Sequence, residues 1–202
     1  MYPPALKSLR YPIGIYRKPA EITLDSLTGS VEAIEKLPGK LEKAVNGLSD
    51  KQLNTPYRPN GWTIRQVIHH LADSHMNGFI RFKLALTEES PRTKSFSEKD
   101  WAKLTDSLAA PINPSLLLIK SLHQRWVMLI NDLTEEDLQR TFTQIERDSE
   151  VTLGEAIAKY AWHGTHHLAH IASLTDRMNW GQGEKDRKHE IGHEQTETAH
   201  AS

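Results

Sequence analysis

Apolar positions recur every three to four residues in several long segments of the chain, a pattern typical of amphipathic helices. The first such segment runs from about Ser30 to Leu48, with a kink expected at Pro38. A shorter helix is expected near Glu98–Leu104. The other long segments cover about residues 63–88, 115–131 and 152–180. The pattern therefore predicts an all-α protein with four long helices arranged as a bundle.

Local sequence signals mark the ends of these helices. Thr63 and Thr152 are each followed three residues later by Gln or Glu. This is the capping box, in which each of the two side chains accepts a hydrogen bond from the backbone of the other residue at the start of a helix. Asn113–Pro114 supplies a cap and a first-turn proline for the third helix. Gly181 is expected to stop the fourth helix.

The segments on either side of the bundle differ from it in composition. Residues 1–27 are rich in proline and lack a helical period, which predicts an irregular N-terminal arm. Residues 182–202 are almost wholly polar, so we expect a disordered tail and exclude its histidines from any site. Residues 28–181 remain as one four-helix-bundle domain, large enough to bury a core without disulfides.

Composition narrows the possible chemistry. The 202 residues include no cysteine, which excludes disulfides, thiolate metal sites and a cysteine nucleophile. The 25 basic and 26 acidic residues are well mixed, so no nucleic-acid partner is expected. No apolar run approaches the roughly 20 residues of a membrane span, and the first ten residues do not resemble a signal peptide. We therefore expect a cytoplasmic protein with no membrane partner.

The histidines are grouped rather than scattered. Seven lie in two of the expected helices: His69, His70 and His75 in the second, and His163, His166, His167 and His170 in the fourth. Separate buried imidazoles would each lose hydration, whereas one cation uses the lone pairs of several together. The grouping therefore predicts a divalent metal site.

Periodicity selects a pair of ligands on the fourth helix. At 100° per residue, His167 lies about 30° and His163 about 70° from the centre of the apolar stripe, and the other two histidines lie further round. A spacing of four residues places two imidazoles side by side, as in zinc-binding helices. Gly164 stands where zinc peptidases have a glutamate general base, so peptidase chemistry is disfavoured.

The third ligand is expected from the second helix, where two candidates stay open. Periodicity favours His75, near the centre of the apolar stripe, over His70, about 120° away. The geometry of helix interfaces can nevertheless bring a flank residue toward the bundle axis.

Three segments resemble a known family. The long stretch at residues 61–77, with its continuation at residues 81–89, is similar to the YfiT branch of the DinB-like metalloenzymes. Tyr11–Gly14 and Trp162–His170 are similar to that branch as well. The resemblance spans most of the chain, from about residue 11 to residue 180.

This resemblance implies an up-and-down four-helix bundle, a homodimer and one divalent ion per chain, zinc in the first place and nickel as the alternative. It also implies that His70, together with His163 and His167, holds the ion. We adopt His70 on that ground, against the preference from periodicity.

Three imidazoles leave one position on the ion open, which is typical of catalytic sites. The pKa of water bound there can be brought down to about 7, which gives hydroxide as a nucleophile. We therefore expect a metal-dependent hydrolase, as the resemblance also implies, and a small-molecule substrate. One alternative is an S-transferase that activates a low-molecular-weight thiol such as bacillithiol. The other is a non-catalytic metal-binding helical module.

The sequence identifies no catalytic group beyond the metal-bound water, but three residues are candidates for supporting roles. Asp73, one turn after His70, could accept a proton from a ligand imidazole. Arg81 and His123 could bind an anionic group of the substrate. Each also has an ordinary explanation, because Asp73 fits an exposed position and the other two fit the flank of a bundle helix.

Overall fold

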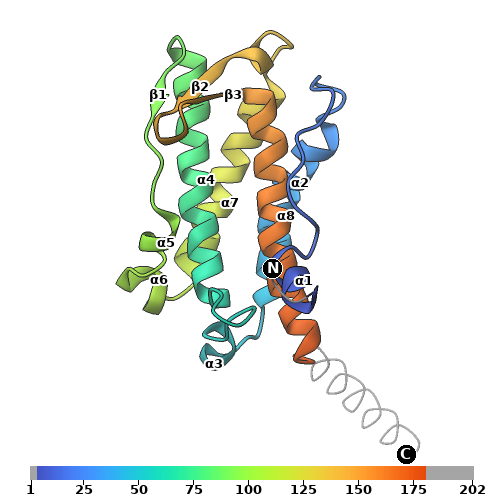
Figure 1. Ribbon diagram of the computed structural model, residues 1–202, viewed down its shortest axis with the longest axis vertical. Coiled ribbons are helices and arrows are strands. Elements are labelled where there is room, and N and C mark those ends of the chain that lie inside the picture. The colour runs from blue at the N-terminus through green and yellow to red at the C-terminus, as the bar shows by residue number, and fades with distance from the viewer. Residues whose placement is uncertain (1–3, 181–202) are drawn as a thin grey trace, which may run out of the picture.

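The computed structural model describes residues 4–180, in which four long helices lie side by side (Figure 1). They are α2 (Thr28–Val45), α4 (Ile64–Thr87), α7 (Asn113–Asn131) and α8 (Leu153–Arg177). Helices α2 and α4 each pack against both α7 and α8. The prediction of an all-α four-helix bundle is confirmed, and the predicted tail lies outside the described residues.

The helix directions differ from the expected up-and-down order. His69 near the start of α4 contacts Ser115 near the start of α7, with 2.8 Å between the imidazole and the hydroxyl. Further along both helices, His75 of α4 contacts His123 of α7, so these two helices run in the same direction. The chain between them returns to the starting end through β1 (Arg92–Thr93), α5 (Glu98–Trp101) and α6 (Thr105–Ala109). Because of this crossover, α4 can lie parallel to the next long helix of the chain.

Short elements complete the structure at both ends of the bundle. The N-terminal arm begins with α1 (Pro4–Arg10), a helix that the apolar pattern did not predict, and α3 (Asp50–Leu53) precedes the turn into α4. A small sheet in the order β1-β2-β3 combines β1 with β2 (Thr141–Gln144) and β3 (Ser149–Thr152). Strand β1 pairs parallel to β2, and β2 pairs antiparallel to β3. Two 3-10 turns lie at Asp137–Gln139 and Ile145–Arg147.

Capping bonds fix where the two histidine-bearing helices begin. The backbone N–H of Gln66 donates to the Thr63 hydroxyl at 3.2 Å, and the side-chain oxygen Oε1 of Gln66 accepts from the backbone N–H of Thr63 at 2.9 Å. The Thr152 hydroxyl accepts from the backbone of Glu155 at 3.1 Å. The Glu155 carboxylate forms an ion pair with Lys18 of the arm instead of returning to Thr152. The arm is therefore tied to the start of α8.

A layer of histidines divides the core into two apolar clusters. One cluster is built around Phe82, Trp126 and Ile157, and the other around Leu41, Ile68 and Ile171. Between them lie the buried side chains of His75 and His123, close to His163. Within residues 4–180, no helix combines the length and the apolar character that crossing a membrane requires.

Candidate metal centre

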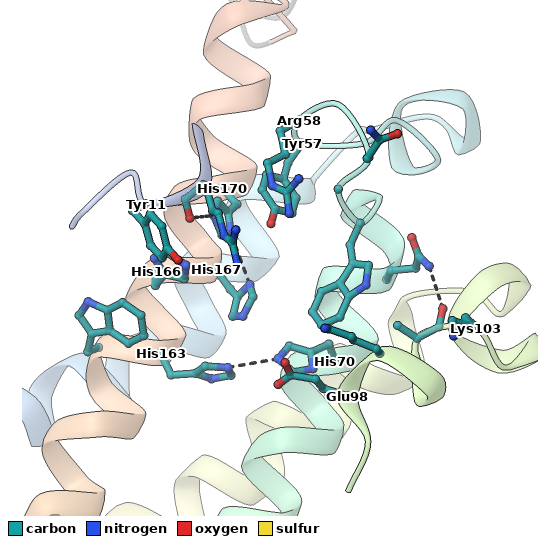
Figure 2. Close-up of a pocket in the computed structure, with 18 residues that line it drawn as sticks. Tyr11, Tyr57, Arg58, His70, Glu98, Lys103, His163, His166, His167 and His170 are labelled. Carbon is teal, nitrogen blue, oxygen red and sulfur yellow. Dashed lines mark hydrogen bonds between the residues drawn. The ribbon is translucent and has the colours of Figure 1, made fainter. Parts of the chain in front are cut away.

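Three histidines from the two facing helices α4 and α8 point toward one another (Figure 2). His70 lies on α4, and His163 and His167 lie one turn apart on α8. Ligand-type nitrogen atoms of all three lie within 4.8 Å of one another. The closest pair is His70 Nε2 and His163 Nε2, which are 3.2 Å apart. The structure therefore brings together the three residues selected in the sequence.

The geometry and charge state of this cluster fit a divalent ion. Tetrahedral zinc with bonds of about 2.0–2.1 Å holds neighbouring nitrogen ligands roughly 3.3 Å apart, close to the 3.2 Å between His70 and His163. Burial lowers the pKa of His70 to about 4. Burial and the neighbouring histidines also hold the pKa values of His163 and His167 well below 6.5. All three imidazoles are therefore neutral at pH 7 and carry the lone pair that a metal ligand needs.

His75, the residue favoured by periodicity, lies behind the cluster. Its Nε2 is 3.2 Å from Nδ1 of His163, and its Nδ1 is 2.9 Å from Nε2 of His123. The side chain is fully buried, as its place on the apolar stripe predicted. His75 contacts both α7 and α8 through these two histidines, whereas His70 contacts α8 and lines the pocket. Periodicity therefore found a buried histidine but not the member of the cluster.

The other histidines of α8 surround His167. The ring of His166 stacks on Trp162 with centroids 4.5 Å apart, and its Nδ1 is buried without a hydrogen-bond partner among residues 4–180. His170 contacts Nδ1 of His167 through its own Nδ1 at 3.4 Å. Nε2 of His170 lies 3.1 Å from the carbonyl oxygen of Arg10 in the arm. Burial lowers the pKa values of His166 and His170 to about 4.

An open pocket of about 620 Å³ gives access to the cluster (Figure 2). Trp62 forms part of its wall, with its ring centroid 4.7 Å from that of His70 and 6.2 Å from that of His167. The remaining wall contains both aromatic and cationic residues, namely Tyr11, Tyr57, Trp162, Arg10, Arg58, Lys99 and Lys103. Only one acidic residue, Glu98, is among the lining residues of this pocket. The pocket thus combines apolar surface with positive charge.

The supporting residues proposed from the sequence lie away from this pocket. Arg81 is buried and donates to the hydroxyl of Tyr160 at 3.1 Å. His123 contacts His75 and the backbone carbonyl of Ile34. Neither residue lines the pocket. The cations that do line it come from the arm, from the turn before α4 and from the α5 region, none of which carries a periodic pattern that could have revealed them.

Asp73 is half-buried on α4 and does not line this pocket. Burial and the nearby charge of Asp106 raise the pKa of its carboxyl group to about 6. Within residues 4–180, no hydrogen bond joins this carboxyl group to His70. The proposed role of Asp73 in orienting a ligand imidazole stays a prediction without geometric support.

A cluster of three histidines that could hold a metal ion, at the wall of an open pocket in a helical bundle, is typical of helical-bundle metalloproteins. The chain belongs to the DinB superfamily, whose profile matches residues 33–171. It is 51% identical over 175 residues to a protein of Bacillus cereus (strain 03BB102) named "Putative metal-dependent hydrolase", with 87% of this chain and 100% of the relative covered. A similarly named protein of Bacillus mycoides (strain KBAB4) is 50% identical with the same coverage.

A solved structure resembles this fold over most of its length. It is that of YfiT from Bacillus subtilis, described as "a probable metal-dependent hydrolase with an unusual four-helix bundle topology". The TM-score is 0.83 at 45% sequence identity, and the match covers 86% of this chain and 99% of YfiT.

Proposed function

We propose that this protein is a metal-dependent hydrolase whose divalent ion is held by His70, His163 and His167. The observation that carries the proposal is the convergence of these imidazoles within 4.8 Å at the wall of an open pocket. An ion with three neutral imidazole ligands keeps a position for substrate or water, and would supply Lewis acidity and nucleophilic water near neutral pH. The names of the similar Bacillus proteins support the same class.

We propose zinc as the ion, with nickel as the alternative. Neutral imidazole nitrogen suits both metals, so the donor set supports either. The spacing of 3.2 Å between His70 Nε2 and His163 Nε2 is close to the edge of a zinc tetrahedron. The homodimer and the cytoplasmic location stay predictions.

The proposed substrate is a small molecule that carries a negative charge. Four cationic residues line the pocket against a single carboxylate, that of Glu98. Lys103 already pairs with Asp100 at 2.8 Å, outside the lining. The buried Nε of Arg58 has no hydrogen-bond partner among residues 4–180, and its guanidinium lies 5.3 Å from the centre of the Tyr57 ring. A positively charged pocket beside a divalent cation raises the local concentration of anions.

The same positive charge would favour a thiolate. A low-molecular-weight thiol such as bacillithiol is therefore the alternative cosubstrate, and S-transfer is the alternative reaction. In that case the residues of the pocket would hold the thiolate near the cluster, and turnover would require the thiol.

The first test is metal content and turnover of the untagged full chain. Mass spectrometry is expected to find about one ion per chain in the parent, none in His70→Ala and His163→Ala, and the parental amount in His69→Ala. Hydrolysis of a panel of anionic and neutral nitrophenyl esters and anilides should stop with a chelator and return with zinc. Turnover only with an added thiol and an electrophile would replace hydrolysis by S-transfer. Metal binding without any turnover would favour the non-catalytic module.

A further inference from the structure

The ligand histidines of α8 each contact a second histidine through Nδ1. His163 Nδ1 faces Nε2 of His75 at 3.2 Å, and His167 Nδ1 faces Nδ1 of His170 at 3.4 Å. In His163 the other ring nitrogen, Nε2, faces Nε2 of His70 at 3.2 Å. In His167 the nitrogen that stays available for a metal is likewise Nε2, because Nδ1 contacts His170. The second histidine can therefore decide which nitrogen of the ligand carries the proton.

The first of these contacts belongs to a chain that ends on a backbone carbonyl. The carbonyl oxygen of Ile34 lies 2.6 Å from Nδ1 of His123 and can only accept, so this Nδ1 carries a proton. Nε2 of a neutral His123 must then accept from Nδ1 of His75, 2.9 Å away. Nε2 of His75 must in turn accept from Nδ1 of His163. Nε2 of His163 is left without a proton.

The second contact gives the same result by a shorter route. The carbonyl oxygen of Arg10 lies 3.1 Å from Nε2 of His170, which therefore donates to it. Nδ1 of a neutral His170 must accept, and its partner is Nδ1 of His167 at 3.4 Å. Nε2 of His167 is again left without a proton. His123 and His170 are only 1% and 2% exposed. Each ring has one carbonyl oxygen and one imidazole nitrogen as its partners, which are the partners that a neutral imidazole with one donor and one acceptor can satisfy.

We propose that two histidine chains, each anchored on a backbone carbonyl, fix the tautomers of His163 and His167 so that both present an unprotonated Nε2 to the metal. One chain consists of His75 and His123, and the other of His170. These three are positioning residues, because they act through the ligands and not on the substrate. The inference rests on the proposed metal site, but it does not require that the reaction be hydrolysis.

The tautomers can be measured in the metal-free protein. Two-bond proton–nitrogen correlation spectra of the full chain, with ¹⁵N-labelled histidine, distinguish the Nδ1–H from the Nε2–H form of each ring. We expect His163 and His167 both to be Nδ1–H at pH 7.5. An Nε2–H form as the main species of either ring would overturn the proposal, whatever the activity of the protein.

Matched substitutions separate positioning from packing. His75→Leu removes the acceptor for His163, whereas His75→Gln can keep a carbonyl oxygen near the place of Nε2. In the same way, His170→Leu removes the acceptor for His167, whereas His170→Asn can keep an oxygen near the place of Nδ1. The expected result is a zinc affinity about 10- to 100-fold weaker in each leucine variant, as for other groups that orient metal ligands. The amide variants should recover most of that loss.

Zinc affinity is measured by competition with a chromophoric chelator, and unfolding by urea is followed on the same samples. His69→Leu is the control, because His69 is also a buried histidine of α4 but contacts Ser115 and the carbonyl of Ala110. It should lower stability and leave zinc affinity unchanged. Equal affinity in the leucine and amide variants, or an equal loss in His69→Leu, would overturn the positioning role. If a leucine variant does not fold, the tautomers of the parent protein decide.

Discussion

Acid is expected to destabilise the metal-free protein well above the pH at which carboxylates titrate. Burial lowers the pKa of His70 to about 4 in the folded state, whereas an unfolded histidine has a pKa of about 6.5. Between these two values the unfolded chain binds the proton and the folded chain does not. The free energy of unfolding must therefore fall as the pH decreases through this range.

The size of the effect follows from the two pKa values. At pH 5, an unfolded histidine is almost fully protonated and His70 is largely neutral, so His70 alone lowers the free energy of unfolding by about 2 kcal/mol relative to pH 7.5. The other histidines of the bundle with lowered pKa values act in the same direction, namely His69, His75, His123, His163, His166, His167 and His170. Asp73 acts in the opposite direction, because its pKa is raised to about 6. We therefore expect a total loss of at least about 2 kcal/mol, a large part of the roughly 5–15 kcal/mol of a typical domain.

The measurement is urea unfolding followed by tryptophan fluorescence, with a chelator present, at several pH values between 7.5 and 5. His166→Gln serves as the comparison, because it removes one titrating group from the rim of the pocket and should reduce the pH dependence. A free energy of unfolding that stays constant down to pH 5 would refute the reasoning. It would mean that these imidazoles are solvated or already charged in the folded protein.

Further predictions concern packing, capping, substrate charge and the ion. A Cβ on Gly78 would lie 2.5 Å from the ring of Tyr160, so Gly78→Ala should lower the free energy of unfolding by about 1–3 kcal/mol. Gly39→Ala should raise the free energy of unfolding by about 0.5–1 kcal/mol, because a Cβ there meets nothing within 4 Å in the middle of α2. Urea unfolding measures both changes, and an equal effect of the two substitutions would contradict the packing argument. Thr152→Ala should lower stability by about 1 kcal/mol by removing the cap of α8, and an unchanged urea midpoint would contradict it. Arg58→Gln should raise the KM of an anionic ester severalfold and leave that of a neutral ester unchanged, and a parallel change in both would exclude a charge effect. Saturating zinc should raise the unfolding midpoint at pH 7.5, and less at pH 5, because the ligands must lose their protons to bind it.

The helices could be predicted because their signals are local. Each long helix has an apolar stripe, and the capping pair at Thr63 and Gln66 forms both of its bonds in the structure. The second capping pair forms only half of its bonds, because Glu155 contacts Lys18, which is distant in sequence. The direction of α7 relative to α4 depends on the path of the crossover between them. Periodicity within a helix carries no information about that path.

The candidate site shows the same division between local and distant signals. The pair His163 and His167 follows from spacing on one helix, which fixes their relative position. His70 could not be chosen by periodicity, because it lies on the flank of α4 that faces α8 and the pocket, whereas the centre of the apolar stripe carries His75 between α7 and α8. The resemblance to a family supplied that residue. The cationic wall of the pocket, including Arg10 and Arg58, comes from irregular segments and had no signal in the sequence.

The histidine layer contributes little to the stability of the fold, which must come from other parts of the bundle. Neutral imidazoles buried at mid-bundle contribute less to stability than apolar side chains would, and their order depends on hydrogen bonds to the carbonyls of Ile34 and Arg10. Most of the folding free energy must then come from the apolar clusters on either side of the layer. Both clusters include residues from all four long helices, so each can hold the bundle together without the ion. Removal of the metal should consequently lower the unfolding midpoint while the far-ultraviolet circular dichroism at pH 7.5 stays unchanged. A loss of helical signal on chelation would show that the ion is part of the folding core and not only of the site.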